Sequence, residues 1–139
     1  MKKTTQELLE ILKKEKLTNY LEENDAELIN APLCTYLTEL LEQRGLKKTN
    51  VIEKSRIFNI YAYQIFAGKK TPSRDKVIQL SFGFELQLSD TQKLLKTAGL
   101  AELYPRNKRD SIIISAIENR LDIMDCDELL YELGQYPLQ

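Results

Sequence analysis

The side chains best suited to chemistry in this chain are cations that gather in one stretch. Residues 44–76 hold nine lysines and arginines against two carboxylates, a net charge of plus seven. The segments before and after it, 1–43 and 77–139, each have a net charge of minus four, so the 139-residue chain stands at minus one. Clustered positive charge attracts a phosphate backbone, because each phosphate that it neutralises releases counterions. The alternative is a solvated face on which the charges cluster by accident.

Side chains for catalysis are scarce. The chain has no histidine and no tryptophan, which excludes imidazole bases, Ser/His/Asp triads and histidine metal sites. The string AGKKT at 67–71 lacks a preceding strand and has Tyr63 where a P-loop needs its first glycine. We therefore expect no enzyme, no metal and no cofactor. A pocket with converging carboxylates such as Asp122, Asp125 and Asp127 would revive the enzyme hypothesis; otherwise these aspartates are helix-start charges.

The cysteines and the N-terminal segment bear on location. Cys34 and Cys126 are far apart and belong to no CxxC spacing, which favours a reducing compartment and packing roles. The leucines of residues 1–17 are interrupted by charged residues and do not form the apolar run of a signal peptide. No segment approaches the roughly 20 apolar residues of a membrane span. These features predict a soluble, cytoplasmic protein without membrane association.

The elements that must position the basic residues are predicted to be helices. No stretch shows the sustained period-two alternation of a half-buried strand. The clearest helical pattern follows Pro32 and ends at Gly45, with apolar residues at i, i+3, i+4, i+7 and i+8. These residues are Leu33, Tyr36, Leu37, Leu40 and Leu41. Two short helices are predicted next, at 48–55 and 58–66.

Capping residues and glycines delimit the remaining helices. The predicted starts are Thr4 with Glu7, Ser73, Ser89 with Gln92, and Asp125 with Glu128. The predicted stops are Gly68, Gly83, Gly99 and Gly134. A short segment with Leu17, Tyr20 and Leu21 follows the first helix, and a loop at 103–110 precedes a buried helix around Ile113. The class is therefore predicted to be all-α.

Residues 46–73, LKKTNVIEKSRIFNIYAYQIFAGKKTPS, resemble the helix-turn-helix of the lambda-repressor-like (XRE) family. That motif usually has a form similar to LTQEELAKKAGVSRSTISRIENGKRNPS, and the two align without a gap. The most specific matches to its I..GKRNPS ending are Ile65, Gly68, Lys69, Lys70, Pro72 and Ser73. The resemblance covers about 50 residues when the preceding helix and the helix from Asp75 to Phe82 are included. The first 30 and the last 50 residues lie outside it.

The resemblance implies a five-helix lambda-repressor-like core at 32–87, with an N-terminal helical extension at 1–31 and a C-terminal helical region at 88–139. Two departures affect the packing. Ile52 and Ala62 reverse the usual order of a small and a β-branched residue, which roughly keeps their summed volume. Arg56 stands where the turn normally has glycine, and a left-handed arginine costs about 1 kcal/mol relative to glycine. We therefore expect a distorted turn.

The resemblance also implies roles for individual residues. In such domains the second helix presents its N-terminal end to phosphates and the next helix lies in the major groove. The residues implied to face the bases are Phe58, Asn59, Ile60, Tyr63 and Gln64. The residues implied to hold phosphates are Lys48, Thr49, Lys69, Lys70, Ser73 and Arg74. The carboxamides of Asn59 and Gln64 can form two hydrogen bonds with adenine, at N6 and N7, and Phe58 or Ile60 can pack on a thymine methyl group.

These observations predict a sequence-specific transcriptional regulator, bacterial or phage-like, that binds double-stranded DNA. We expect a homodimer, because one module makes too few contacts for tight specific binding. The helix at 58–66 is unusually apolar for a groove reader, and such a surface is also typical of a protein interface. The alternative is therefore an adaptor that uses the aromatic face of this helix to bind a protein partner. A further possibility is that Tyr61 and Tyr63 belong to the core.

Overall fold

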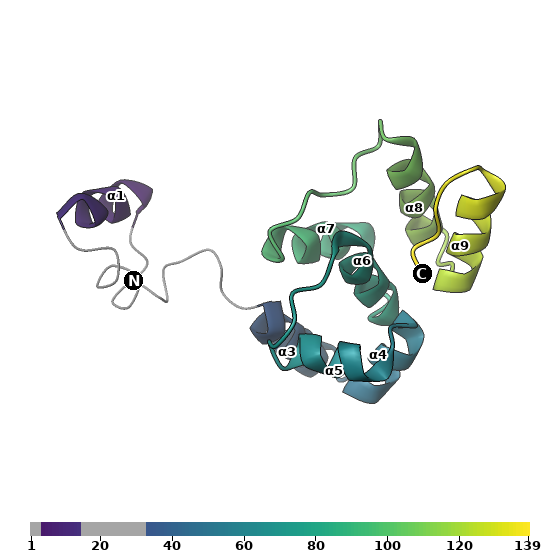
Figure 1. The fold of residues 1–139 in the computed structure, drawn as a ribbon, viewed down its shortest axis with the longest axis horizontal. Coiled ribbons are helices and arrows are strands. Elements are labelled where there is room, and N and C mark those ends of the chain that lie inside the picture. The colour runs from purple at the N-terminus through teal and green to yellow at the C-terminus, as the bar shows by residue number, and fades with distance from the viewer. Residues whose placement is uncertain (1–3, 15–32) are drawn as a thin grey trace. The chain divides into compact units, whose positions relative to one another are not determined.

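The computed structural model describes residues 4–14 and 33–139, and these residues form eight helices and no strand (Figure 1). The all-α prediction is confirmed for this part of the chain. The chain divides into two compact units, Met1–Ala31 and Pro32–Gln139. The predicted segment with Leu17, Tyr20 and Leu21 lies outside the described residues, as does Pro32. Within the described helices, none has the length and apolar character needed to cross a membrane.

The first unit contributes one described helix, α1 (Thr5–Lys14). The Thr4 hydroxyl oxygen accepts a hydrogen bond from the Glu7 backbone N–H at 3.1 Å. This contact satisfies one of the free donors at the helix start. The predicted start of the first helix is therefore confirmed.

The second unit begins with three helices, α3 (Leu33–Arg44), α4 (Lys48–Ser55) and α5 (Asn59–Phe66). Helix α5 packs against both α3 and α4. The buried apolar side chains are Leu37, Leu40 and Leu41 from α3, Val51 and Ile52 from α4, and Ala62, Ile65 and Phe66 from α5. The other two residues of the predicted α3 pattern, Leu33 and Tyr36, are partly buried against this core. Both members of the reversed pair, Ile52 and Ala62, are among the buried residues, which shows that the exchange is accommodated in the core.

Helix α6 (Arg74–Gly83) is the central element of this unit, and it is buried from Val77 to Gly83. Among the described helices, α4 and α6 form the most extensive helix–helix contact. A Cβ atom on Gly83 would lie 2.5 Å from the carbonyl oxygen of Val51, so only glycine allows this approach. The Gln79 side chain, also buried, donates a hydrogen bond to the Ser55 carbonyl at 3.0 Å. These contacts fix the end of α4 against α6.

Three further helices, α7 (Leu88–Thr97), α8 (Lys108–Glu118) and α9 (Ile123–Glu132), complete the unit. Helix α7 packs on α6, and α8 packs on α9 (Figure 1). The predicted capping box of Ser89 and Gln92 is wrong. Helix α7 begins at Leu88 without a side-chain cap, so Ser89 lies inside its first turn. The Gln92 amide instead exchanges two hydrogen bonds with the Leu103 backbone, at 2.9 and 2.7 Å.

The last two helices begin earlier than predicted. Helix α8 starts at Lys108, inside the predicted loop, because the Asn107 side chain accepts a hydrogen bond from the Asp110 N–H at 2.9 Å. Helix α9 starts at Ile123, because Asp122 caps it by accepting from the Asp125 N–H at 2.9 Å. In both cases a side chain upstream of the predicted start accepts a hydrogen bond from one of the free N–H groups of the first turn.

A repeated Arg-Asp dipeptide joins α8 to α6. Arg74 pairs with Asp110 at 2.9 Å, and Arg109 pairs with Asp75 at 2.9 Å. Arg109 also donates to the carbonyls of Tyr136 and Pro137 and so holds the C-terminal tail. The two ion pairs connect the predicted segments 32–87 and 88–139, which lie in the same compact unit.

Candidate nucleic-acid interface

The turn between α4 and α5 sets the direction of α5. Arg56 adopts the left-handed conformation, with φ 56° and ψ 24°, and its N–H donates to the Glu53 carbonyl at 3.2 Å. The buried Ser55 hydroxyl donates to the Ile52 carbonyl at 2.6 Å and accepts from the Ile57 N–H at 3.3 Å. Arg56 thus takes the left-handed conformation that glycine normally takes at this position, and it closes the turn with a backbone hydrogen bond. The turn accommodates arginine without the expected distortion.

One side of α5 is open to solvent. The Phe58 and Ile60 residues are 74% and 64% exposed. Asn59 and Tyr63 are also exposed, and Gln64 is half-buried. All five side chains predicted to face bases therefore remain accessible. Tyr61, in contrast, is partly buried and packs against the core, so the core role considered for the two tyrosines holds for Tyr61 alone.

The exposed side of α5 carries no charge, since the helix NIYAYQIF contains no acidic or basic residue. Its possible contacts are therefore hydrogen bonds from carboxamides and the tyrosine hydroxyl, together with apolar packing. A side chain of this kind cannot pair with guanine in the way that arginine and lysine do.

The N-terminal ends of α4 and α5 are both free of side-chain caps. No side chain accepts a hydrogen bond at Lys47 or Phe58, the capping positions, and neither first turn contains an acidic residue. Helix α7 is also uncapped, but Asp90 lies in its first turn. The first N–H groups of α4 and α5 therefore remain available to an anion, with the positive end of each helix dipole behind them.

Ion pairs divide the nine basic residues of the segment 44–76 into two groups. Arg44 pairs with Asp90, Lys54 with Glu85 and Arg74 with Asp110. The remaining six make no ion pair with any residue that the structure describes: Lys47, Lys48, Arg56, Lys69, Lys70 and Lys76. The charge of plus seven counted along the sequence is therefore partly neutralised in the fold.

Four of these unpaired cations gather where α4 begins and α5 ends. The Lys48 ammonium lies 5.6 Å from the centre of the Phe66 ring, at the last residue of α5. Lys69 and Lys70 follow three and four residues after Phe66, and Lys47 precedes Lys48. We call Lys47, Lys48, Lys69 and Lys70 the lysine cluster. Lys47 was not among the predicted phosphate contacts, although its position next to Lys48 at the start of a short helix was a usable signal.

The other predicted phosphate contacts have different surroundings. Thr49 is exposed in the first turn of α4. Ser73 is exposed, and its hydroxyl oxygen accepts from the Lys76 N–H at 3.4 Å as the cap of α6. The Arg74 guanidinium is held by Asp110 and donates to the carbonyls of Ala101 and Glu102 at 2.9 and 3.0 Å. We therefore do not include Arg74 in the candidate interface.

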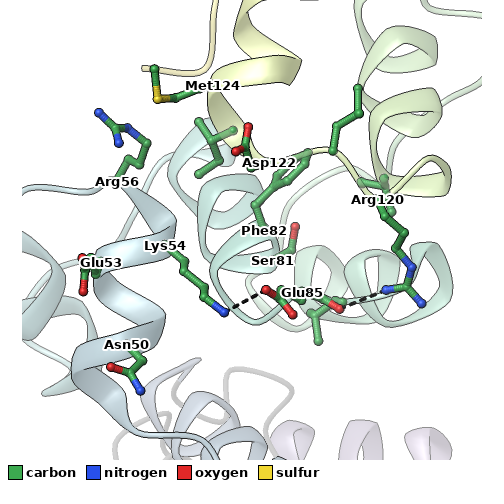
Figure 2. Close-up of a pocket in the computed structure, with 14 residues that line it drawn as sticks. Asn50, Glu53, Lys54, Arg56, Ser81, Phe82, Glu85, Arg120, Asp122 and Met124 are labelled. Atoms are coloured by element: carbon green, nitrogen blue, oxygen red, sulfur yellow. Dashed lines mark hydrogen bonds and ion pairs between the residues drawn. The ribbon is translucent and has the colours of Figure 1, made fainter.

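A second surface feature is a groove of about 670 Å³ bordered by α4, the end of α6 and the turn between α8 and α9 (Figure 2). Sequence reasoning did not identify this groove. Asp122 lines it, but Asp125 and Asp127 do not. Asp127 instead accepts hydrogen bonds from the backbone of Leu138 and Gln139. The three aspartates considered for an enzyme site therefore do not converge there.

No protein-family model, curated protein or solved structure matches the chain. The function must therefore be inferred from the surfaces described above.

Proposed function

We propose that the protein is a sequence-specific DNA-binding regulator that places α5 in the major groove. The observation that carries the proposal is the accessible, uncharged side of α5 beside two uncapped helix starts and the lysine cluster. The major groove admits an α-helix, and cations and helix N-termini at its edges hold phosphates. In an interface of this kind, the residues that bind phosphates and position the protein are different from those that contact the bases.

The proposed contacts follow this division. Lys48, Lys69 and Lys70 bind phosphates, with Thr49 and Ser73 as neutral hydrogen-bond partners. These contacts set the register of the protein on DNA without reading sequence. On α5, the residues proposed to read bases are Asn59 and Gln64 through hydrogen bonds, and Phe58, Ile60 and Tyr63 through packing and the tyrosine hydroxyl.

The proposal extends to the whole unit. We infer that α3 to α7 form the five-helix core of a lambda-repressor-like domain and that α8 and α9 brace it through the two Arg-Asp pairs. We also infer that the regulator is cytoplasmic. It would bind as a homodimer, because two half-sites about 34 Å apart supply the contacts that one module lacks.

The salt dependence of duplex binding tests the proposed phosphate contacts. Each neutralised phosphate contributes about −0.9 to the slope of log affinity against log salt. Removing Lys48, Lys69 and Lys70 by substitution with glutamine should therefore flatten the slope by about 2.7 per bound protomer. Those three contacts alone correspond to about a 40-fold loss of wild-type affinity per protomer between 50 and 200 mM salt.

A matched variant separates this effect from the change in net charge. Lys93, Lys96 and Lys108 are exposed residues of α7 and α8, and their replacement by glutamine removes the same charge away from the proposed contacts. We expect its slope to equal that of the wild type. Equal slopes for both triple variants would overturn the assignment of phosphate contacts.

A second candidate function is supported by the exposure of Phe58 and Ile60. Neighbouring apolar side chains this open to solvent are also typical of a surface that binds another protein. In that adaptor, the same α5 surface would contact a protein partner and duplex DNA would not bind even at low salt. Partner binding would then be lost in Phe58→Ala and retained in the lysine-to-glutamine variant, whereas DNA binding should be weakened by both.

A further inference from the structure

The groove in Figure 2 combines an apolar floor with a charged rim. The buried residues of its floor are Phe82, Leu86, Ile117 and Ile123. The charged residues of its rim are Glu53, Lys54, Arg56, Glu85, Arg120 and Asp122. Its volume of about 670 Å³ lies within the range of about 300–1,000 Å³ usual for small-molecule sites.

The rim contains an unusual concentration of left-handed residues. Among the described residues, positive φ occurs at four glycines and at three other positions, Arg56, Glu85 and Arg120, with φ of 56°, 57° and 57°. These three follow the last turns of α4, α6 and α8, and all three line this groove. A side chain in this conformation is less stable than glycine, and such strain gathers at functional sites. The chain therefore carries charged side chains here at positions where glycine would be more favourable.

The pairing of the rim charges indicates which ligand would fit. Lys54 and Glu85 neutralise each other at 2.8 Å, and the Asp122 carboxylate caps α9. The guanidinium groups of Arg56 and Arg120 make no ion pair with a described residue. Their hydrogen bonds to neutral oxygens are long, 3.4 Å to the Gln139 side chain and 3.5 Å to the Glu85 carbonyl.

Arg120 is the better anchor of the two arginines. Figure 2 shows the two guanidinium groups at opposite ends of the groove, with Glu53 on the side of Arg56. Among the carboxylates that line this groove, Glu53 lies toward Arg56, whereas Glu85, which lies toward Arg120, is already paired with Lys54. Glu118 lies near Arg120 but borders a neighbouring hollow and does not line this groove. Guanidinium groups bind carboxylates and phosphates in a bidentate manner.

We propose that this groove binds a small organic anion, with its apolar body on the floor and its carboxylate or phosphate on Arg120. The proposal stands apart from DNA binding. It concerns a different surface and does not need the lysine cluster or the exposed side of α5.

Amide-resolved NMR of the full chain tests the proposal with three probes that share one apolar body: octanoate, octyl phosphate and octan-1-ol. We expect either anion to shift the amide signals of Glu85, Arg120, Leu121 and Ile123, and to bind about ten-fold or more tightly than the alcohol. The tighter anion identifies the preferred head group. Equal binding of the alcohol, no shift with either anion, or shifts confined to α5 would overturn the proposal.

The variant Arg120→Gly separates ligand binding from folding. It removes the guanidinium and relieves the left-handed side chain, so we expect a higher melting temperature together with at least about a ten-fold loss of anion affinity. Arg120→Asn, whose residue tolerates the same conformation, serves if the glycine variant is poorly folded. Arg106→Gln, an exposed arginine outside the groove, should bind the anion as the wild type does. Undiminished binding by both Arg120 variants would contradict the site.

Discussion

Replacing Asp110 by asparagine tests the joint that holds α8 against α6. The Asp110 carboxylate accepts two hydrogen bonds from Arg74, both at 2.9 Å, and one from the Tyr104 N–H at 2.9 Å. The side chains of Asp110 and Arg74 are only 8% and 27% exposed. Asparagine keeps the shape of the side chain but removes the charge and turns a donor group toward donors. We therefore expect a clear loss of stability.

The size of this loss follows from the contacts. Hydrogen bonds to charged groups contribute about 1.5–3 kcal/mol each, and breaking a buried ion pair costs about 3–5 kcal/mol. Arg74 keeps its two carbonyl partners and part of its hydration, so we expect a destabilisation of about 2–3 kcal/mol. In urea unfolding, this corresponds to a midpoint lowered by roughly 1–2 M.

A more exposed pair provides the control. The side chains of Arg44 and Asp90 are 34% and 35% exposed, and Asp90→Asn should cost less than about 1 kcal/mol. The reasoning is refuted if Asp110→Asn unfolds within about 0.5 kcal/mol of the wild type, or no earlier than Asp90→Asn.

The same joint predicts a pH dependence. Burial alone would raise the pKa of Asp110, but hydrogen bonds from Arg74 and Tyr104 and the nearby charges lower it below its ordinary value. Because the folded pKa lies below the unfolded one, the stabilisation by Asp110 is fully present above the unfolded pKa. It is lost as the pH falls through the folded pKa. The difference in unfolding free energy between wild type and Asp110→Asn should therefore shrink in acid and stay constant near neutral pH.

Three further predictions concern separate parts of the unit. Gly83→Ala should destabilise by about 1–3 kcal/mol in urea unfolding, because its Cβ would lie 2.5 Å from the Val51 carbonyl oxygen; the stabilisation usual for glycine to alanine in a helix would contradict this packing. Burial raises the pKa of Cys126 to about 12, so a thiol reagent at neutral pH should label the half-buried Cys34 first, and equal rates would count against it. Replacing a contacted thymine by deoxyuridine should weaken DNA binding about four-fold, because the free energy of burying one methyl group is lost. The proposed packing of Ile60 fails if Ile60→Ala loses as much affinity on this replacement as the wild type does.

The helical class and most helix positions follow from local patterns. Apolar residues at helical spacing predict α3, and Ser73 and Gly83 mark the two ends of α6, because these signals act over a few residues. The exposure of Phe58 did not follow, since a large apolar side chain is compatible with both core and surface. The structure resolves this by burying Ala62 and Ile65 and leaving Phe58 outside.

Long-range partners account for what sequence reasoning missed. Arg74 has the charge and position of a phosphate contact, yet its partner Asp110 lies 36 residues away and is invisible to local patterns. Gln92 was assigned to a capping box because its partner also lies outside the local pattern. Its amide bonds to the backbone of Leu103, 11 residues away. The groove is lined by three left-handed residues. The alignment with a glycine indicated this conformation at Arg56, but nothing in the residue types of Glu85 and Arg120 signals it.

Selection of bound sequences from a pool of random DNA duplexes tests the central proposal most directly, with wild-type protein and Gln64→Ala compared at low salt. We predict that the wild type enriches a palindrome with half-sites about one helical turn apart and that its affinity falls linearly with salt on a log scale. Gln64→Ala should relax the preference at one base pair in each half-site, at a cost of about 1–3 kcal/mol. Failure of the wild type to bind any duplex at low salt would contradict the proposal.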